Sequence, residues 1–284
     1  MDANLDFRPS PIAGRWYPGE PRRLASSVDT YLEEAKLPDI KGQVIAVMAP
    51  HAGHIYSGPV AGYAFSALRG LHPDLVAVIS PMHFPYPGPL LTSAHTAYQT
   101  PLGAVWIDRQ AVEALSNYLQ TDLGYGLTPV RNDPEHSLEI ELPFLQRALP
   151  EPFRLIPVMV RDQTIPVARA LGKALAKVLA GKQAVLVAST DLSHFYTRQQ
   201  ADLLDAEMLR QVEAFDPAGV MQVEEEGKGF ACGRSALAAV LWAAKDLGAD
   251  TARVLYHATS GDITGDYSEV VGYAAAVITR QGDD

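Results

Sequence analysis

Residues suited to metal binding or catalysis follow three apolar runs in this sequence, each within a few positions: His51 after residues 44–49, His83 after 75–80, and Asp191 and His194 after 184–189. Imidazole binds iron, copper and zinc, and it can also transfer protons near neutral pH. Because parallel strands deliver their carboxyl ends to one edge of a sheet, we expect these side chains to share one crevice.

Cys232 offers a third metal donor. It lies in GFACGRSA, at the start of a helical pattern, where a helix N-terminus favours the thiolate. Two imidazoles and one thiolate suit iron(II), copper or zinc and leave positions open for water or substrate. The alternative for Cys232 is a small buried hydrophobic residue, which is the commonest role of a free cysteine. The alternative for each histidine is a turn residue that bonds a backbone carbonyl.

Asp191 and His194 are three residues apart, so on one helical turn they would share a face. The aspartate could then orient an imidazole while the histidine moves a proton. Asp191 might equally cap the following helix. Ser193 and Ser57 are candidate nucleophiles of a hydrolase, but neither lies in a Gly-x-Ser-x-Gly turn.

The elements that position these residues are strands alternating with helices. Short runs rich in Val and Ile predict strands at residues 44–49, 75–80, 155–160, 184–189, 254–259 and 270–278. Amphipathic segments predict helices at 21–35, 59–68, 108–119, 137–149, 165–179, 198–215 and 233–247. This order predicts one α/β domain over residues 1–284, a three-layer sandwich with a mostly parallel central sheet flanked by helices. The irregular segment 85–108 is expected to add short antiparallel strands.

Composition limits the partners and the cellular location that we expect. The 284 residues carry 23 Lys and Arg against 33 Asp and Glu, a net charge of -10, which argues against nucleic acid and anionic membranes as partners. The single cysteine permits no internal disulfide. With no secretory signal pattern at the start of the sequence and no apolar run of about 18 residues, we expect a cytoplasmic location.

Several motifs together resemble the Memo protein family, whose bacterial and archaeal members are called AmmeMemoRadiSam system protein B. They occur in the family's order and spacing: AGRWYPG (13–19), PHAGHIYSGPVA (50–61), TPLGAVWID (100–108), EHSLEIELPFLQ (135–146), STDLSHF (189–195), ACGR (231–234) and SGDITGDYSEVVGYAA (260–275). The resemblance covers almost the whole chain. It is specific because no single motif carries it alone.

The resemblance implies a fold similar to class III extradiol ring-cleaving dioxygenases, which are non-haem iron enzymes. It implies metal ligands at His51, His83 and Cys232, an acid/base role for His194 with Asp191 beside it, and a place for His136 near the crevice, where it would orient a ligand. In the dioxygenases the third ligand is a carboxylate, whereas here Cys232 takes that place. Iron or copper is expected in preference to zinc.

Three functions follow as hypotheses. The first is a metal-dependent oxidoreductase in which His194 moves protons. The second is a non-catalytic module that recognises a small-molecule or peptide ligand, or a partner enzyme, in the same crevice. The family name implies a radical SAM protein as one candidate partner. The third, a serine hydrolase, ranks last.

Overall fold

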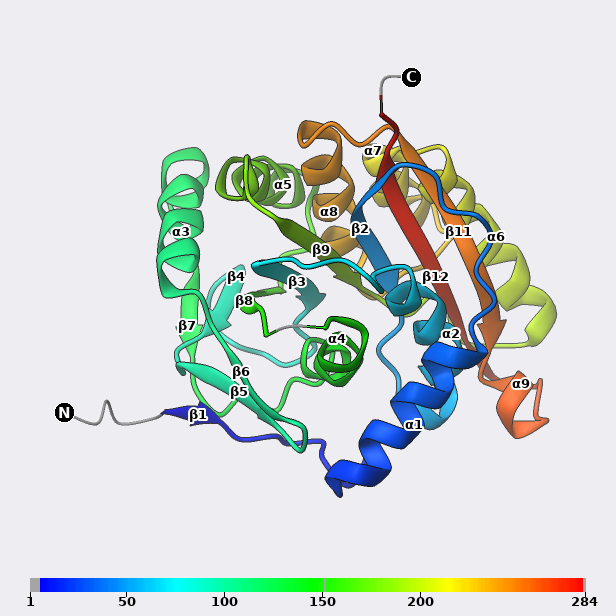
Figure 1. The fold of residues 1–284 in the computed structure, drawn as a ribbon. Coiled ribbons are helices and arrows are strands. Elements are labelled where there is room, and N and C mark those ends of the chain that lie inside the picture. Colours follow the sequence, from blue (N-terminus) through cyan, green and yellow to red (C-terminus); the bar gives the residue numbers. More distant parts are fainter. Residues whose placement is uncertain (1–5, 151, 283–284) are drawn as a thin grey trace.

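A mixed nine-stranded sheet forms the centre of the computed structural model, which describes residues 6–150 and 152–282 (Figure 1). Its strand order is β10 (His194–Tyr196), β12 (Val270–Arg280), β2 (Gln43–Ala49), β9 (Ala184–Ser189), β3 (Leu75–Pro81), β8 (Arg154–Val160), β4 (Leu90–Ser93) and β7 (Thr128–Val130), and β11 (Thr251–Thr259) also pairs with β12. Strands β2, β9, β3 and β8 are mutually parallel. The pairings of β12 with β2, β10 and β11, and of β4 with β8, are antiparallel.

Helices cover both faces of this sheet (Figure 1). One layer contains α1 (Pro21–Glu34), α2 (His54–Ser66) and α4 (Leu142–Ala148), which contact one another. The other contains α3 (Arg109–Leu123), α5 (Ile165–Leu179), α6 (Arg198–Glu213), α7 (Pro217–Glu225) and α8 (Arg234–Asp246). The short elements η1 (Glu139–Glu141) and α9 (Gly261–Thr264) complete the helices of the described residues. This arrangement is consistent with the predicted three-layer sandwich.

The central strands form because their apolar residues can be covered on both faces. Every residue of β3 is buried, and so is every residue of β2 after Gln43. Continuous Val- and Ile-rich runs of this kind are typical of parallel strands between two helical layers. The six predicted strands are confirmed, with ends that differ by three residues at most.

The segment 85–108 supplies short strands, as expected. Its first strand, β4, joins the central sheet beside β8. The others, β5 (Ala97–Thr100) and β6 (Gly103–Trp106), pair antiparallel with each other, and β5 pairs in parallel with β1 (Phe7–Arg8). These three strands form a separate small sheet.

Three details of the prediction were wrong. The sheet is mixed: its four central strands are parallel, and so are β4 and β7 with each other, but the four other pairings are antiparallel. Helix α2 begins at His54 instead of at residue 59, because Gly53 is its N-cap and Pro59 lies inside the helix. No helix was predicted between residues 215 and 233, but Pro217–Glu225 form α7, and the side chain of Asp216 caps its N-terminus by accepting from the backbone of Ala218.

Two glycines bring α1 and α2 into contact. A Cβ at Gly58 would lie 2.5 Å from the ring of Tyr31, and one at Gly62 would collide with the carbonyl oxygen of Tyr31. The glycines that follow His51 in the sequence therefore serve, at least in part, to let two helices pack closely.

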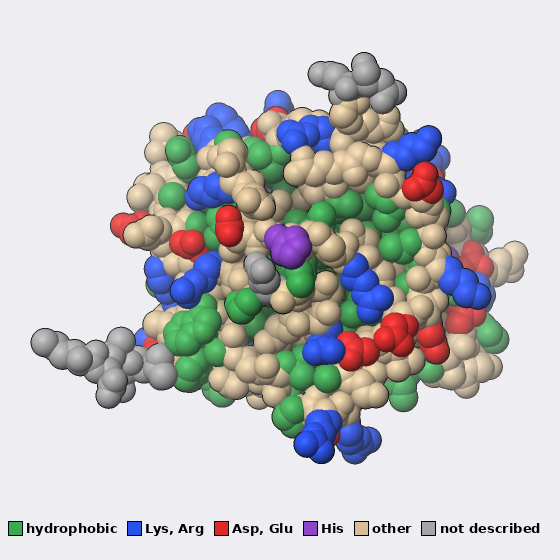
Figure 2. All heavy atoms as spheres, in the orientation of Figure 1, with side chains coloured by type: hydrophobic (Ala, Val, Ile, Leu, Met, Phe, Trp, Pro, Cys, Tyr) green, Lys and Arg blue, Asp and Glu red, His purple; other side chains and the backbone are tan. Residues whose placement is uncertain are grey.

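The surface carries charges of both signs. On the face drawn in Figure 2, basic and acidic side chains are interspersed with hydrophobic ones. Within residues 6–150 and 152–282, no helix combines the length and apolar character needed to cross a bilayer.

Candidate metal centre

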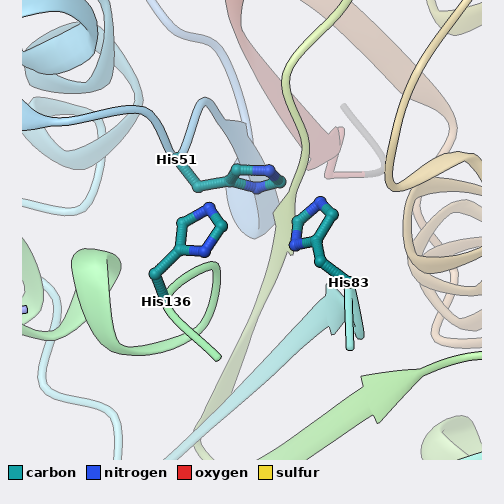
Figure 3. Close-up of side chains that lie close together, drawn as sticks. All are labelled: His51, His83 and His136. Carbon is teal, nitrogen blue, oxygen red and sulfur yellow. The ribbon is translucent and has the colours of Figure 1, made fainter. Parts of the chain in front are cut away.

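Three histidines from three separate segments converge at one edge of the central sheet (Figure 3). His51 follows β2, His83 follows β3, and His136 precedes η1. Each offers a ring nitrogen, and these atoms all lie within 4.8 Å of one another. The ring centroids of His51 and His83 are 5.3 Å apart, and those of His51 and His136 are 5.5 Å apart. The parallel neighbours β2, β9 and β3 bring the strand ends together, as predicted.

One buried carboxylate, that of Glu135, orients two of the three rings. Its Oε1 lies 3.0 Å from Nδ1 of His83 and 3.2 Å from Nδ1 of His136. It also accepts backbone N–H groups from His83, His136 and Ser137. Anchoring both rings through Nδ1 leaves Nε2 of each as the nitrogen available to a metal, an arrangement common around metal-binding histidines.

Charge in this cluster is distributed unevenly. Burial alone would raise the pKa of Glu135, but hydrogen bonding and attraction from His83 and His136 lower it, so this group is a carboxylate. Burial lowers the pKa of His83, yet Glu135 raises it overall. Burial lowers the pKa of His136 to about 4, and repulsion from His83 acts in the same direction. His136 is therefore neutral near pH 7, as a metal ligand must be.

His51 is the most buried member of the cluster. Its Nδ1 lies 2.9 Å from Oγ of Ser189, and its backbone N–H donates to Oδ1 of Asp191 over 2.7 Å. Burial lowers the pKa of His51 well below its ordinary value, and the neighbouring histidines lower it further. Its ring is therefore neutral, and its Nε2 faces the interior of the site.

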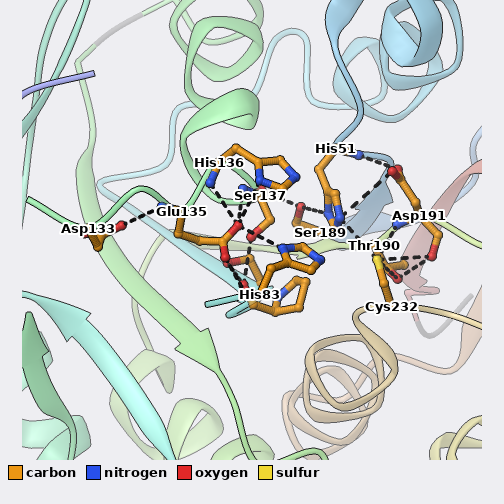
Figure 4. A network of polar contacts seen from close by, with 12 residues as sticks. His51, His83, Asp133, Glu135, His136, Ser137, Ser189, Thr190, Asp191 and Cys232 are labelled. Atoms are coloured by element: carbon orange, nitrogen blue, oxygen red, sulfur yellow. Dashed lines mark hydrogen bonds and ion pairs between the residues drawn. The ribbon is translucent and has the colours of Figure 1, made fainter. Parts of the chain in front are cut away.

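Cys232 approaches the same nitrogen from another side (Figure 4). Its Sγ lies 3.1 Å from Nε2 of His51, 3.3 Å from the backbone nitrogen of Asp191, which donates to it, and 3.8 Å from Oγ1 of Thr190. Such a separation is short enough for two ligands of one ion. Cys232 is nevertheless outside the set of three whose donor atoms are all within 4.8 Å.

The prediction that a helix N-terminus lowers the pKa of this thiol was wrong. Although Cys232 immediately precedes Gly233, the N-cap of α8, burial raises its pKa well above the ordinary value, and the carboxylate of Asp191 raises it further. Desolvation of the charged form outweighs the helix dipole here. A thiolate at this position needs a cation beside it.

Asp191 holds a loop and does not cap a helix. Helix α6 begins seven residues later in sequence, with Thr197 as its N-cap, so the predicted helical turn shared by Asp191 and His194 is absent from this segment. Burial raises the pKa of Asp191 to about 7, opposed by hydrogen bonds from the backbones of His51 and Ala52.

His194 begins β10, and one of its ring nitrogens, Nε2, has no hydrogen-bond partner among the described residues. Its Nδ1 lies 2.7 Å from the carbonyl oxygen of Leu192, which can only accept, so Nδ1 carries the proton and Nε2 holds a lone pair. Burial lowers the pKa of His194, and the charge of His83 lowers it further. A neutral imidazole with a free Nε2 can act as a base.

A carboxylate on α6 fixes the loop that carries His194. Oδ1 of Asp205 accepts the backbone N–H of Ser193 over 3.0 Å, and its Oδ2 is 2.8 Å from Nε2 of His257. The backbones of Ser193 and Gly272 are also hydrogen-bonded. A Cβ at Gly272 would collide with the carboxylate of Asp205.

The segment that carries Glu135 and His136 is held by a buried arginine. Arg8 donates to both carboxylate oxygens of Asp133, at 2.9 and 2.8 Å, and to the carbonyl oxygen of Glu135 at 2.7 Å. Arg8 also pairs with Glu139, whose Oε1 accepts from the hydroxyl of Tyr17.

Sequence reasoning missed the hydrogen-bond partners that orient the cluster. Glu135, Ser189 and Glu141 were not predicted as site residues, although Glu135 directly precedes His136 and Ser189 ends a strand of the site edge. The candidate nucleophiles are both inaccessible. Ser57 donates to the carbonyl oxygen of Ala52 over 2.9 Å, and Oγ of Ser193 is buried with no hydrogen-bond partner among the described residues.

A pocket of about 490 Å³ lies next to the cluster. Ala52 and Gly53, which follow His51, line it together with Tyr56 and Phe195. Trp16 also lines it and packs on His136 with ring centroids 4.1 Å apart.

The comparisons with known proteins agree with one another. A family model described as Memo-like protein matches residues 8–277. A MEMO1 family protein of Nitrosopumilus maritimus is 32% identical over 271 residues, covering 93% of this chain and 96% of its own. MEMO1 family proteins of Methanopyrus kandleri and Pyrobaculum aerophilum are 35% and 30% identical, covering 95% and 97% of this chain and 98% and 100% of their own.

Proposed function

We propose that this chain, which belongs to the family of Memo-like proteins, binds a redox-active metal ion and acts as an oxidoreductase. The observation that supports this proposal is that three imidazoles converge at one place and that the Nδ1 atom of each already has a partner. Nδ1 of His51 contacts Ser189, and those of His83 and His136 contact Glu135. Only the Nε2 atoms remain for a ligand.

The donor set fits iron or copper. His51 and His83 are the two ligands we assign to the ion, and Cys232 is the third because its Sγ already lies 3.1 Å from Nε2 of His51. His136 is within reach as a further imidazole donor. Imidazole and thiolate are the ligand types that copper and iron accept, and a bound ion would supply the redox step.

His194 supplies proton transfer in this proposal. The hydrogen bond to the carbonyl oxygen of Leu192 keeps the proton of His194 on Nδ1. The lone pair of Nε2 is then directed away from that bond. Asp191 orients the His51 backbone and lies beside Cys232. We also propose that the α/β fold is of the class III extradiol dioxygenase type and that residues 1–284 form one domain.

Metal analysis tests the proposal directly. Protein purified without chelator and without nickel affinity resin is expected to retain stoichiometric iron or copper, measured by inductively coupled plasma mass spectrometry. His83→Ala should lose that metal, whereas His72→Ala, a change at an exposed histidine, should keep it. Retention of metal after His51→Ala and His83→Ala together would overturn the assigned site.

A second candidate function is recognition of a peptide or small molecule without catalysis. The pocket beside the cluster favours it, because Trp16, Tyr56 and Phe195 present aromatic surface there. Phe195 is 70% exposed and Ile55, which also lines the pocket, is 64% exposed, so apolar surface is available to a ligand there. A Phe195→Ser variant that loses ligand binding while metal-free protein binds the ligand normally would support this function over the first.

A further inference from the structure

Ser189 is the centre of a three-way hydrogen-bonded junction beneath His51. Its Oγ lies 2.6 Å from the carbonyl oxygen of Ser137, 2.6 Å from Oε1 of Glu141 and 2.9 Å from Nδ1 of His51. Figure 4 shows the contacts of Ser189, the last residue of β9, with His51 and Ser137. All three contacts are short enough to be hydrogen bonds.

The junction allows one arrangement of protons. A serine hydroxyl has one proton and two lone pairs, and a backbone carbonyl can only accept. The Ser189 proton must therefore point to Ser137, since otherwise two oxygen lone pairs would face each other at 2.6 Å. Both remaining neighbours, Glu141 and His51, must then donate to Ser189.

The surroundings of Glu141 suit a neutral acid. The residue is 1% exposed, and its Oε2 is buried without a hydrogen-bond partner among residues 6–150 and 152–282. Burial raises the pKa of Glu141 well above its ordinary value, and the nearby Asp191 acts in the same direction. A buried carboxylate with one unpartnered oxygen would be costly, whereas a carboxylic acid carries no charge.

We propose that Glu141 is a positioning residue that remains protonated and donates its O–H to Ser189, so that it does not compete with Ser137 for the Ser189 proton and Ser189 stays the acceptor for Nδ1–H of His51. The consequence is that His51 presents the lone pair of Nε2 to the ion. The last step rests on the proposed metal-binding function, but the protonation of Glu141 and the tautomer of His51 do not. Glu141 touches neither the ion nor a ligand, and it acts only through Ser189.

Two substitutions separate this role from simple packing. Glu141→Gln keeps the size of the side chain and an N–H that can donate to Ser189. Ser189→Ala removes the oxygen that accepts from both Glu141 and Nδ1–H of His51. The Gln variant should behave like the wild type, and the Ala variant should not.

The first readout needs no metal. We expect the infrared difference spectrum between metal-free wild type and Glu141→Gln to contain the C=O band of a protonated carboxyl group. In ¹⁵N NMR spectra of both proteins, His51 should be the Nδ1–H tautomer, and in Ser189→Ala it should be a mixture. A wild type without the protonated-carboxyl band would overturn the proposal.

The second readout is metal affinity, measured by competition with a chelator. Loss of an outer partner of a ligating histidine typically weakens metal binding by about 10–100-fold. Ser189→Ala should show a loss of that order with a melting curve that remains cooperative, and Glu141→Gln should stay close to the wild type. Equal affinity of the Ala variant and the wild type, or equal weakness of both variants, would contradict the positioning role. A wild type that binds no metal would overturn the proposed function alone, because the infrared and NMR results stand independently.

Discussion

His83 and His136 stack face to face, with 4.9 Å between their ring centroids and 13° between their planes, because Nδ1 of each contacts the same oxygen of Glu135. The two histidines are 53 residues apart in sequence, one in the segment after β3 and the other in the segment before η1. Their shared acceptor sets the direction of both Nε2 atoms, so the geometry of the site depends on one buried carboxylate.

Replacing that carboxylate should therefore damage the site more than replacing one histidine partner. In Glu135→Ala, both rings lose their anchor and three backbone N–H groups lose their acceptor. We expect metal affinity to fall by at least about tenfold and the free energy of unfolding to fall by about 3 kcal/mol or more. Chelator competition and urea unfolding measure the two effects. Glu225→Gln, at an exposed position, is the control and should change neither.

Cys232→Ser should fold normally and contain less metal. The substitution replaces a soft thiolate with a hydroxyl, so the loss of affinity should be largest for copper(I) and smaller for iron(II) or zinc. Metal-free wild type should be alkylated more slowly than a free thiol in the same buffer, because burial raises the pKa of Cys232. Unchanged copper(I) affinity in the variant would leave Cys232 with a structural role only, and His136 would then be the third ligand.

His194→Gln should abolish turnover and leave metal content and melting temperature nearly unchanged. The amide can still donate to the carbonyl of Leu192, but it cannot take up a proton at neutral pH. Metal analysis, thermal unfolding and an oxidation assay on the same preparation measure the three quantities. If metal is lost together with activity, His194 is a ligand and not a base.

Acid should destabilise the fold partly through His54. Burial lowers the pKa of this residue to about 4 from 6.5, so the folded state keeps it neutral while the unfolded chain takes up a proton below about pH 6.5. The stability that depends on neutral His54 is complete above pH 6.5 and is lost as the pH falls toward 4, by about 3 kcal/mol in total.

Comparison with a variant isolates this contribution, because His51 and His136 titrate in the same direction. His54→Gln should be less stable than the wild type at pH 7 but should lose less stability between pH 7 and pH 4. Urea unfolding at several pH values measures both slopes. An identical slope in His54→Gln and the wild type would assign the acid sensitivity to other groups.

The sequence predicted most of the fold because the strong signals in it are local. The strand at 184–189 and the helix at 165–179 have the predicted bounds, since a run of Val and Leu, or an amphipathic pattern after Thr164, needs no distant partner to be recognised. Helix α2 was misplaced because Pro59 is typical of a first helical turn, whereas here it lies inside the helix.

The candidate site could be predicted only in part. Histidines at strand ends are visible in a sequence, and so His51, His83 and His194 were found. The groups that orient them are not visible, because Glu135 is 52 residues from His83, and Ser189 is 138 residues from His51. The pKa of Cys232 was predicted in the wrong direction, because the sequence shows the following helix but not the burial that outweighs its dipole.

The position of His194 depends on Gly272. This residue of β12 has no side chain, and that empty space is what allows Asp205 of α6 to reach the backbone of Ser193. If His194 has the proposed role, the orientation of its imidazole is thus set by the spacing between a helix and a strand, neither of which supplies a proposed metal ligand. Substitutions that widen the gap between α6 and β12 should then slow the proposed reaction while metal content and fold stay unchanged.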